Sequence, residues 1–297
     1  PLVDGPSDTL IFPNENGLVY TLRLNTVFDL QAASLRIDPE YTSYRYKMGN
    51  QKDQGIESSM AIYGHYGYFN DNSGIFHCID LNRMVPVWSR QLEDDSDVTP
   101  LLKQEADRLV VYTGTEVDWQ KGIIGVYQGT AFVYKLDAMT GEILWEQTVP
   151  CYTKKAADHG DDINGGVMGT PIMGKRGLEG SVIFSFCMTN GVYSGNSLIA
   201  FDETDGSVLW EYQMTHYTWS SPVDLYDEQG NGYIVIPDSQ SQLHLLDGKT
   251  GQLLDVLQLV FDENGQGAGN IESSCAVFNN QLVIGTRGNI IAGVTLH

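Results

Sequence analysis

The sequence predicts an all-β chain made of repeated four-stranded antiparallel units, and three observations support this prediction. The first is a hairpin pattern that recurs along the chain. The second is a pair of serines, or a serine or threonine followed by proline, at the start of each unit. The third is the composition, because 32 glycines among 297 residues, with 10% aromatic residues, suit many short strands joined by turns.

The clearest copy of the hairpin covers residues 133–147. Tyr134, Leu136, Ile143 and Trp145 are apolar or aromatic, with polar residues between them for most of the run, which is the period of half-buried strands. In the turn, the Asp137 carboxylate can accept hydrogen bonds from amides two residues on, and Gly141 can adopt a positive φ. The segment therefore predicts a tight hairpin whose second strand projects Trp145 sideways.

The same hairpin recurs at intervals of about 45–65 residues along the chain. The turn and docking residues predicted from the four copies are Asp80, Trp88, Asp137, Gly141, Trp145, Asp202, Gly206, Trp210, Asp247 and Gly251. The copy at Asp80 lacks the turn glycine, and the copy at Asp247 has Asp255 in place of tryptophan. A repeat of this length with one strand cluster per unit is typical of a β-propeller blade.

A hydroxyl pair or a hydroxyl-proline step opens each unit. These openings are Ser58 with Ser59, Thr99 with Pro100, Thr170 with Pro171, Ser220 and Ser221 with Pro222, and Ser273 with Ser274. A strand pattern follows each opening, and proline is tolerated at a strand start. We therefore expect four antiparallel strands per blade, with the opening strand innermost and the tryptophan-bearing strand outermost.

Six blades are recognisable, and the last is incomplete. The strands of the first are expected at residues 1–4, 8–13, 18–24 and 34–37, and the sixth runs from Ser273 through three strands. Residues 1–297 are interpreted as a single β-propeller domain or as the C-terminal portion of a longer propeller, since unpaired edges are ordinarily closed or covered. Alternatively, residues 1–4 pair within the last blade and close a six-bladed ring.

Charge excludes two classes of partner. The chain has 17 basic and 38 acidic residues, a formal net charge of −21, which disfavours nucleic acid and anionic membranes. No run of about 18 apolar residues is present, so no membrane insertion is expected. The acidity either keeps an aromatic-rich β protein soluble or reflects carboxylates that converge on a cation or basic ligand.

The cysteines do not predict a metal site. Cys78, Cys151, Cys187 and Cys275 show no metal-ligand spacing and no adjacent pair. Cys78 and Cys187 lie in apolar strand runs, where a thiol usually acts as a small core residue. Three disulfide pairings are compatible with four cysteines, and the sequence does not choose among them.

Because propeller blades start at the central channel, the residues just before each opening are expected to ring one mouth of it. The predicted ligand-binding residues are Glu57, Asp97, Trp219 and Glu272, and the loop before Thr170 adds Asp158, Asp161, Asp162 and Asn164. The candidate metal ligands are Glu57, Asp97, Asp161, Asp162 and Glu272, since Ca²⁺ takes several oxygen ligands. An aromatic wall also suits an organic cation or a sugar. Alternatively, these carboxylates bind backbone amides or face water.

The repeat Leu-Asp-x-x-Thr-Gly-x-x-x-Trp resembles the tryptophan-docking motif of propellers related to pyrroloquinoline-quinone (PQQ) dehydrogenases. It is close to that motif at Leu136–Trp145 and at Phe201–Trp210, partial at Asp80 and Asp247, and lost in the first and last units. The chain is similar to secreted PQQ-like propeller-repeat proteins of Gram-positive anaerobes. That resemblance implies up to eight blades, an extracellular or cell-surface location and no assigned chemistry.

Two functions are compatible with this resemblance. PQQ-dependent dehydrogenases of alcohols or sugars bind the quinone at the channel mouth, beside a Ca²⁺ held by Glu, Asn and Asp, and often have a vicinal disulfide. This sequence has no adjacent cysteines and no residue-by-residue match to that set, so PQQ is not expected, while Ca²⁺ remains a candidate. The favoured interpretation is a non-catalytic propeller that presents its channel mouth and loops to a small molecule or a protein.

Overall fold

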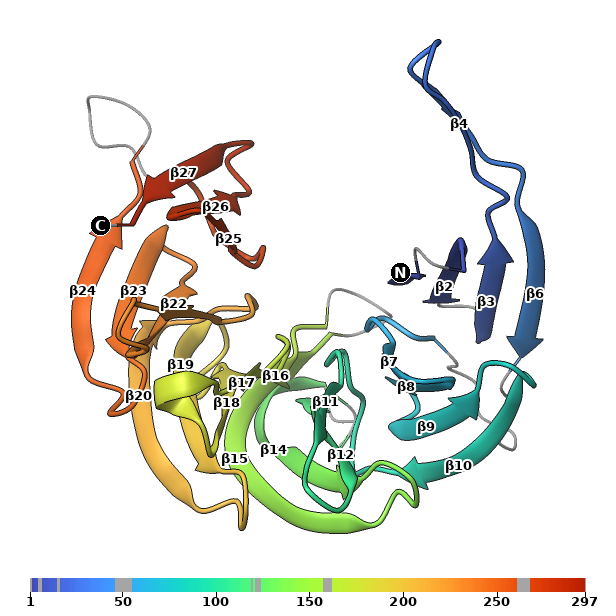
Figure 1. Cartoon of the computed structure of the whole chain (residues 1–297). Coiled ribbons are helices and arrows are strands. Elements are labelled where there is room, and N and C mark those ends of the chain that lie inside the picture. The colour runs from blue at the N-terminus through green and yellow to red at the C-terminus, as the bar shows by residue number, and fades with distance from the viewer. Residues whose placement is uncertain are drawn as a thin grey trace.

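The computed structural model describes residues 2–4, 7–14, 17–45, 55–118, 120, 124–156, 162–260 and 268–296. Within these residues, six β-sheets lie side by side in an open arc, and a separate two-stranded ribbon projects from the first (Figure 1). We call these sheets blades 1 to 6 in chain order. No helix among the described residues is long and apolar enough to cross a membrane.

Blades 1 to 3 occupy the N-terminal half. Blade 1 contains β1 (Leu2–Asp4), β2 (Thr9–Asn14), β3 (Leu18–Arg23) and β6 (Glu40–Arg45). The ribbon contains β4 (Val27–Asp29) and β5 (Ser34–Arg36). Blade 2 contains β7 (Ala61–Tyr63), β8 (Tyr66–Asn70), β9 (Ile75–Asp80) and β10 (Val85–Gln91). Blade 3 contains β11 (Leu101–Gln104), β12 (Leu109–Gly114), β14 (Gly125–Asp137) and β15 (Ile143–Lys155).

Blades 4 to 6 complete the arc. Blade 4 contains β16 (Gly165–Val167), β17 (Ile172–Met173), β18 (Ser181–Cys187), β19 (Ser194–Asp202) and β20 (Val208–His216), with the short 3-10 helix η1 (Arg176–Leu178) before β18. β13 (Glu116–Val117) leaves blade 3 and pairs with β16. Blade 5 contains β21 (Val223–Tyr226), β22 (Gly232–Pro237), β23 (Gln242–Asp247) and β24 (Leu253–Gln258). Blade 6 contains β25 (Ala276–Phe278), β26 (Gln281–Gly285) and β27 (Ile291–Thr295).

The all-β propeller-type fold predicted from the repeat is confirmed. Neighbouring strands in the blades are antiparallel and follow chain order. The opening strands lie toward the centre of the arc, whereas β10, β15, β20 and β24 form its outer rim (Figure 1). Blade 6 has three strands within the described residues, as expected for the incomplete last unit.

The prediction for the fourth strand of blade 1 was wrong. Residues 34–37 were expected there, but Ser34–Arg36 pairs with β4 in the projecting ribbon, and β6 takes the fourth position beside β3. β6 pairs with β3 over six residues, from Leu18↔Arg45 to Arg23↔Glu40. Ser34–Arg36 alternates polar and apolar residues, whereas Glu40–Arg45 does not, so periodicity favoured the inserted strand over the blade strand.

The first described strand pairs inside its own blade. Leu2, Val3 and Asp4 lie opposite Ile11, Leu10 and Thr9 of β2. Blade 1 and blade 6 stand on opposite sides of the opening of the arc (Figure 1). Residues 2–4 therefore do not close the ring through blade 6, as the six-bladed alternative required.

The outer-strand tryptophans contact the turn of the next blade. Trp88 Nε1 donates to the Ala138 carbonyl at 3.0 Å, and Trp145 Nε1 donates to the Glu203 carbonyl at 3.2 Å. Trp210 repeats this with Gly248 at 3.1 Å. Trp145 and Trp210 are buried and Trp88 is partly buried, so each ring lies in the seam between two blades.

The turn that receives each ring has little space for a side chain. The Asp137 carboxylate accepts the amides of Met139 and Thr140, both at 2.9 Å. Gly141 follows with φ 71°, and a Cβ there would lie 2.7 Å from the Trp88 ring. Only glycine satisfies both the left-handed φ and the close ring.

The turn of blade 2 has no tryptophan ring packed against it. Its turn has Met84 at the glycine position, with φ 52°. The blade 1 strand β6 has no tryptophan, and the Met84 side chain packs with Val19 and Tyr44 in the seam instead. The seam between blades 1 and 2 is therefore filled by a side chain of the later blade, Met84, and not by a tryptophan of the preceding blade.

The opening hydroxyls join neighbouring blades at the inner rim. The Ser59 amide donates to Thr99 Oγ1 at 3.2 Å, and the Thr170 amide donates to Ser221 Oγ at 2.9 Å. The Ser221 amide donates in turn to Ser274 Oγ at 3.0 Å. The repeated hydroxyl mark thus satisfies strand-start amides across the seams.

Candidate functional site

The four predicted ligand-binding residues lie on one face of the arc. Glu57, Asp97, Trp219 and Glu272 each precede the innermost strand of a blade. Since the strands are antiparallel, the turns between the second and third strands of the blades lie on this same face. Two groups of side chains gather there, which we call the acidic group and the aromatic cleft.

The acidic group consists of Asp95, Asp97 and Glu116. Asp95 and Asp97 come from the connection between β10 and β11, and Glu116 comes from β13, which pairs with Gly166 of blade 4. Asp95 and Glu116 are buried. The Asp95 carboxylate accepts the Ser96 amide at 2.6 Å, so the chain turns this aspartate inward.

Burial and mutual repulsion favour the protonated form of these carboxyl groups. Burial, followed by the charge of Asp97, raises the pKa of Asp95 to about 8. Burial also raises the pKa of Asp97, and burial and the charges of Asp97 and Asp95 raise the pKa of Glu116 well above its usual value. Asp97 and Glu116 share a hydrogen bond, which requires a proton on one of them.

The carboxylates around the acidic group already have hydrogen-bond or ion-pair partners. Glu57 is exposed and accepts the Asn72 side-chain amide at 2.6 Å. Lys155 forms ion pairs with Asp118 and with Asp162, the latter at 2.8 Å. Burial lowers the pKa of Lys155, but its hydrogen bonds to Asp118 and Asp162 outweigh burial and raise it to about 12.

The described residues do not form a calcium cage. Among the described residues, no three His, Cys, Asp or Glu side chains converge closely enough to hold one metal ion. Asp158 and Asp161 lie outside the described residues. Asn164 accepts Thr153 Oγ1 at 3.3 Å. The prediction of a calcium site at the channel mouth therefore stays a prediction.

The aromatic cleft lies toward blades 5 and 6 and has a volume of about 340 Å³. Its lining residues are Tyr193, Tyr217, Trp219, Ser239, Gln240, Asn270, Glu272 and Arg287. The Tyr217 ring centroid lies 5.3 Å from that of Tyr193 and 5.6 Å from that of Trp219. The rings come from the β18–β19 connection of blade 4 and from the segment between β20 and β21, and polar groups of blades 5 and 6 lie beside them.

The polar groups of the cleft are ordered and balanced in charge. Tyr217 Oη donates to Glu272 Oε1 at 3.2 Å and accepts from Asn270 Nδ2 at 3.3 Å. Arg287 Nε forms an ion pair with Glu272 Oε2. Burial, then the charge of Glu272, raises the pKa of Tyr217 to about 12, so its hydroxyl remains a donor at neutral pH.

The structure divides the predicted site in two. Glu57 and Asp97 lie within electrostatic reach of each other beside the acidic group, whereas Trp219 and Glu272 line the aromatic cleft. Cys187 and Met188 pack with Tyr217 and Trp219 in one apolar cluster. The four cysteines are free and buried.

Several residues of this face were not found from the sequence. Asp95 and Tyr217 lie four and three residues before an opening, Glu116 lies in β13, and Arg287 lies in the turn between β26 and β27, and none of them carries a repeated mark. The sequence did contain a signal for two Asp–His contacts. The spacing Asp-x₅-His occurs twice, at Asp71 with His77 and at Asp238 with His244. His77 Nε2 lies 2.9 Å from Asp71 Oδ2, and the corresponding distance in blade 5 is 3.3 Å.

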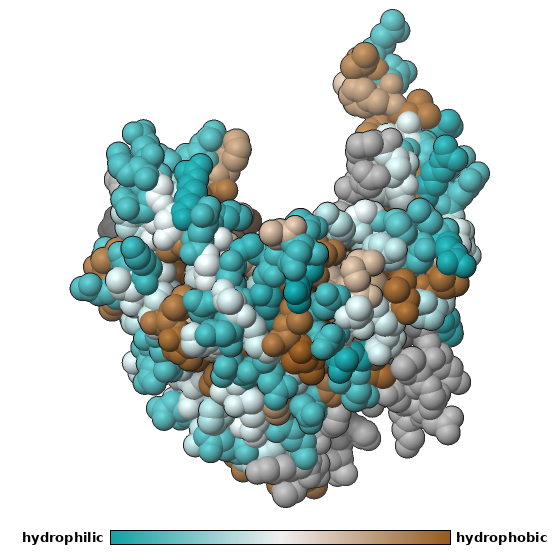
Figure 2. Space-filling view, turned by 60° about the horizontal axis from the view of Figure 1, so that its bottom comes forward, coloured by the Kyte–Doolittle hydropathy of each residue, from teal (hydrophilic) through white to brown (hydrophobic). Residues whose placement is uncertain are grey.

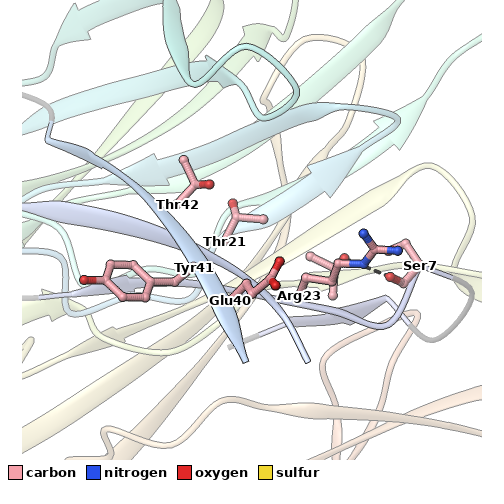
Figure 3. A pocket seen from close by; sticks show the side chains of 7 residues that line it. Ser7, Thr21, Arg23, Glu40, Tyr41 and Thr42 are labelled. Atoms are coloured by element: carbon pink, nitrogen blue, oxygen red, sulfur yellow. Dashed lines mark hydrogen bonds between the residues drawn. The ribbon is translucent and has the colours of Figure 1, made fainter. Parts of the chain in front are cut away.

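A second, shallower groove of about 670 Å³ lies on blade 1. Ser7, Thr21, Arg23, Glu40, Tyr41 and Thr42 surround it (Figure 3). Thr9 Oγ1, also in its lining, donates to the Ser7 carbonyl at 3.1 Å. Its lining belongs to a single blade, with no side chain from a neighbouring blade among the described residues, so we regard it as a surface groove.

Comparison with protein families agrees with this architecture. The family model described as outer membrane protein assembly factor BamB (PQQ_2) matches residues 86–293, more than half of the chain. The chain belongs to the PQQ_2 family. A search of curated proteins returns no match to it.

Two solved structures are similar to this PQQ_2 chain. A europium-containing methanol dehydrogenase has a TM-score of 0.64 at 15% identity, over 96% of this chain and 60% of that chain. The quinohemoprotein alcohol dehydrogenase from Comamonas testosteroni has a TM-score of 0.58 at 12% identity, over 94% of this chain and 50% of that chain. This chain therefore spans between half and three-fifths of their length, and the likeness shows the fold alone.

The predicted resemblance to PQQ-type propellers is confirmed by the family match. The resemblance of the PQQ_2 chain to proteins of Gram-positive anaerobes is not tested by these comparisons and stays a prediction. Its location outside the cell or at the cell surface also stays a prediction.

Proposed function

We propose that this PQQ_2 propeller is a non-catalytic binding protein that takes a neutral, hydroxyl-rich ligand such as a sugar in the aromatic cleft. The observation that carries the proposal is the ordered row of Tyr193, Tyr217 and Trp219 beside the Glu272–Arg287 ion pair. We place the protein outside the cell or at its surface, where such ligands are available.

The charge of the cleft favours a neutral ligand over an organic cation. The Glu272 carboxylate is already neutralised by Arg287 and accepts the Tyr217 hydroxyl. A cation would have to displace the guanidinium, whereas a sugar can use both charged groups as hydrogen-bond partners. Ring faces and amide groups supply the remaining contacts, and the volume is within the range of small-molecule sites.

The test is titration calorimetry with neutral glucose-, galactose- and N-acetylglucosamine-based oligosaccharides, with choline as the cationic probe. We expect saturable binding of a neutral oligosaccharide and none of choline. Tyr193→Ala should weaken binding about tenfold, or ~1.4 kcal/mol. Tyr41→Ala is the matched control, because Tyr41 is also an exposed tyrosine but lies on blade 1.

Three outcomes would contradict the proposal. Binding of choline alone would assign the cleft to organic cations. Dye reduction with alcohols or sugars, seen only after addition of PQQ and Ca²⁺, would support the alternative of a PQQ- and Ca-dependent dehydrogenase. An equal loss of affinity in the Tyr41 and Tyr193 variants would show that the bound sugar does not occupy the cleft.

A further inference from the structure

The acidic group contains a buried acceptor that the protein does not satisfy. Glu116 is 2% exposed, and its Oε1 atom has no hydrogen-bond donor from the protein among the described residues. The side chain that lies against it is another acid, because Glu116 and Asp97 share a hydrogen bond. Burial removes the hydrogen bonds that a carboxylate makes to water, so an oxygen without a donor is costly. Glu116 Oε1, directed into the acidic group, therefore indicates a ligand that donates hydrogen bonds.

No cationic side chain pairs with the acidic group. Within the ranges that the structure describes, no lysine, arginine or histidine forms an ion pair with Asp95, Asp97 or Glu116. The charges of Glu57 and Asp118 add to the repulsion at Asp95 and Asp97. Carboxyl groups gathered in this way require either protons or a cation.

A neighbouring set of acids shows how the protein itself meets this requirement. The Lys155 ammonium forms ion pairs with both Asp118 and Asp162, the latter at 2.8 Å. One primary ammonium thus joins carboxylates from two segments of the chain. The acidic group is a similar set of carboxyl groups that lacks such a lysine.

The arrangement of the acids favours an ammonium over a metal ion. No three His, Cys, Asp or Glu side chains in the described ranges converge closely enough to hold one metal. Calcium requires oxygens at about 2.3–2.6 Å, whereas the N–H···O bonds of an ammonium span about 2.7–2.9 Å, so its acceptors stand further apart. An alkylammonium has three N–H donors, and the acidic group has three carboxyl groups to accept them. A guanidinium has five donors in one plane, and some of them would remain without an acceptor.

The acids extend from the surface into the interior. Glu57 is exposed and Asp97 is partly buried, whereas Asp95 and Glu116 are buried. This gradient suits a charged group at the end of a slim alkyl chain. Ser58 Oγ, which is buried and has no partner among the described residues, is a further acceptor next to Glu57.

The charge of the whole molecule also favours a cationic ligand. The chain has a net charge of −21, and hydrophilic residues cover much of the surface seen in Figure 2. A protein with this excess of negative charge attracts cations and raises their concentration near its surface.

We propose that the acidic group binds a primary alkylammonium, as found in a polyamine or a lysine side chain, and that Asp95, Asp97 and Glu116 accept its N–H groups. Blades 2, 3 and 4 enclose this site. Asp95 and Asp97 connect blade 2 to blade 3, and Glu116 lies on β13, which pairs with blade 4. The site is separate from the aromatic cleft, so the inference does not depend on the binding of a sugar there.

The test is titration calorimetry of the 297-residue chain at pH 8 and constant ionic strength with cadaverine, spermidine and Nα-acetyl-lysine amide. Tetramethylammonium is the control ligand, because it is a cation without an N–H donor. We expect saturable binding of a primary amine that is at least tenfold tighter than that of tetramethylammonium. Tighter binding of cadaverine or spermidine identifies a polyamine as the ligand, and tighter binding of the lysine derivative identifies a lysine side chain.

A pair of double variants locates the bound amine. Asp97→Asn/Glu116→Gln keeps the shape of the two side chains and should weaken amine binding at least tenfold. Asp205→Asn/Glu211→Gln is the matched control, because it removes two acids from exposed positions of blade 4 and should change the affinity less than twofold. The comparison of ligands uses the wild type alone, so it decides the question even if the first variant does not fold.

The proposal is wrong if the wild type shows no saturable binding of any primary amine. Equal affinities for cadaverine and tetramethylammonium, or equal losses in the two double variants, would also overturn it, because they indicate a general attraction of cations to the acidic chain. Displacement of the amine by Ca²⁺, with Ca²⁺ binding lost in Asp97→Asn/Glu116→Gln, would assign the acidic group to a metal ion instead.

Discussion

Asp95 illustrates how a single side chain on the channel face affects the whole fold. Its pKa of about 8 lies above the value of roughly 4 in an unfolded chain. Between these values the native state binds more protons than the unfolded state, so stability falls as pH rises. We expect Asp95→Asn to flatten the decline in melting temperature between pH 5 and pH 8 and to stabilise the protein at pH 8 by about 1–2 kcal/mol.

Asp107→Asn is the control for the Asp95 prediction. Asp107 is exposed, and its pKa is lowered by the hydrogen bond to Arg108, so its effect on stability has the opposite sign. A wild type whose melting temperature does not change between pH 5 and pH 8 would contradict the assignment of protons to the acidic group.

Trp145 and Gly206 should depend on each other. A Cβ at Gly206 would lie 2.8 Å from the Trp145 ring. Trp145→Ala is expected to cost about 3–5 kcal/mol, and Gly206→Ala about 1–3 kcal/mol. In the double variant the costs should be less than additive, because removal of the ring makes room for the methyl group. Urea unfolding with unchanged m-values measures all three.

Gly180→Ala separates strain from the steric clash. Gly180 has φ 88°, similar to 76° at Gly206, but a Cβ there meets nothing within 4 Å. Its cost should add fully to that of Trp145→Ala. If Gly206→Ala is also fully additive with Trp145→Ala, the ring and the turn are not coupled.

At this scale the sequence predicted repeated residues well and single residues poorly. Asp137, Gly141 and Trp145 share a fixed spacing, and their contacts are local or with the adjacent blade. Glu116 reaches the acidic group only because β13 pairs with blade 4. Burial of that kind depends on tertiary placement and leaves no periodic mark in the sequence.

Among the elements, the hydroxyl openings make a testable contribution to the seams. Ser221→Ala removes the acceptor of the Thr170 amide and should cost about 1–2 kcal/mol in urea unfolding. Ser59→Ala keeps the amide that donates to Thr99 and should change stability by less than about 0.5 kcal/mol. Equal effects of the two substitutions would refute a seam role for the Ser221 hydroxyl.

The inserted ribbon shows why element boundaries were harder to predict than element type. Ser34–Arg36 alternates polar and apolar residues and Glu40–Arg45 does not, but both form strands. Which of them joins blade 1 depends on the turn at Asp29, whose carboxylate accepts the amides of Gln31 and Ala32 at 2.9 and 3.0 Å. That turn makes a local hairpin, and β3 is left to pair with the later strand.

For the whole molecule, the net charge of −21 predicts a dependence of stability on salt. The lysine ion pairs are few, and like charges on adjacent blades repel across the open arc. Raising NaCl from 10 mM to 150 mM shortens the screening length from about 30 Å to 8 Å. The melting temperature should therefore rise by several degrees, about 1 kcal/mol, and an unchanged value would show that the carboxylates are already compensated.

Met84 has a mechanical consequence. The seams after blades 2, 3 and 4 are each fastened by a tryptophan ring and its hydrogen bond, whereas the seam after blade 1 relies on Met84 and its apolar neighbours. The seam after blade 5 also lacks a tryptophan, because Asp255 takes that position in β24, so blades 1 and 6 should rupture first under tension between the termini. An optical trap should record early, low-force steps of about 10–15 nm, followed by stronger steps as the tryptophan-fastened blades separate.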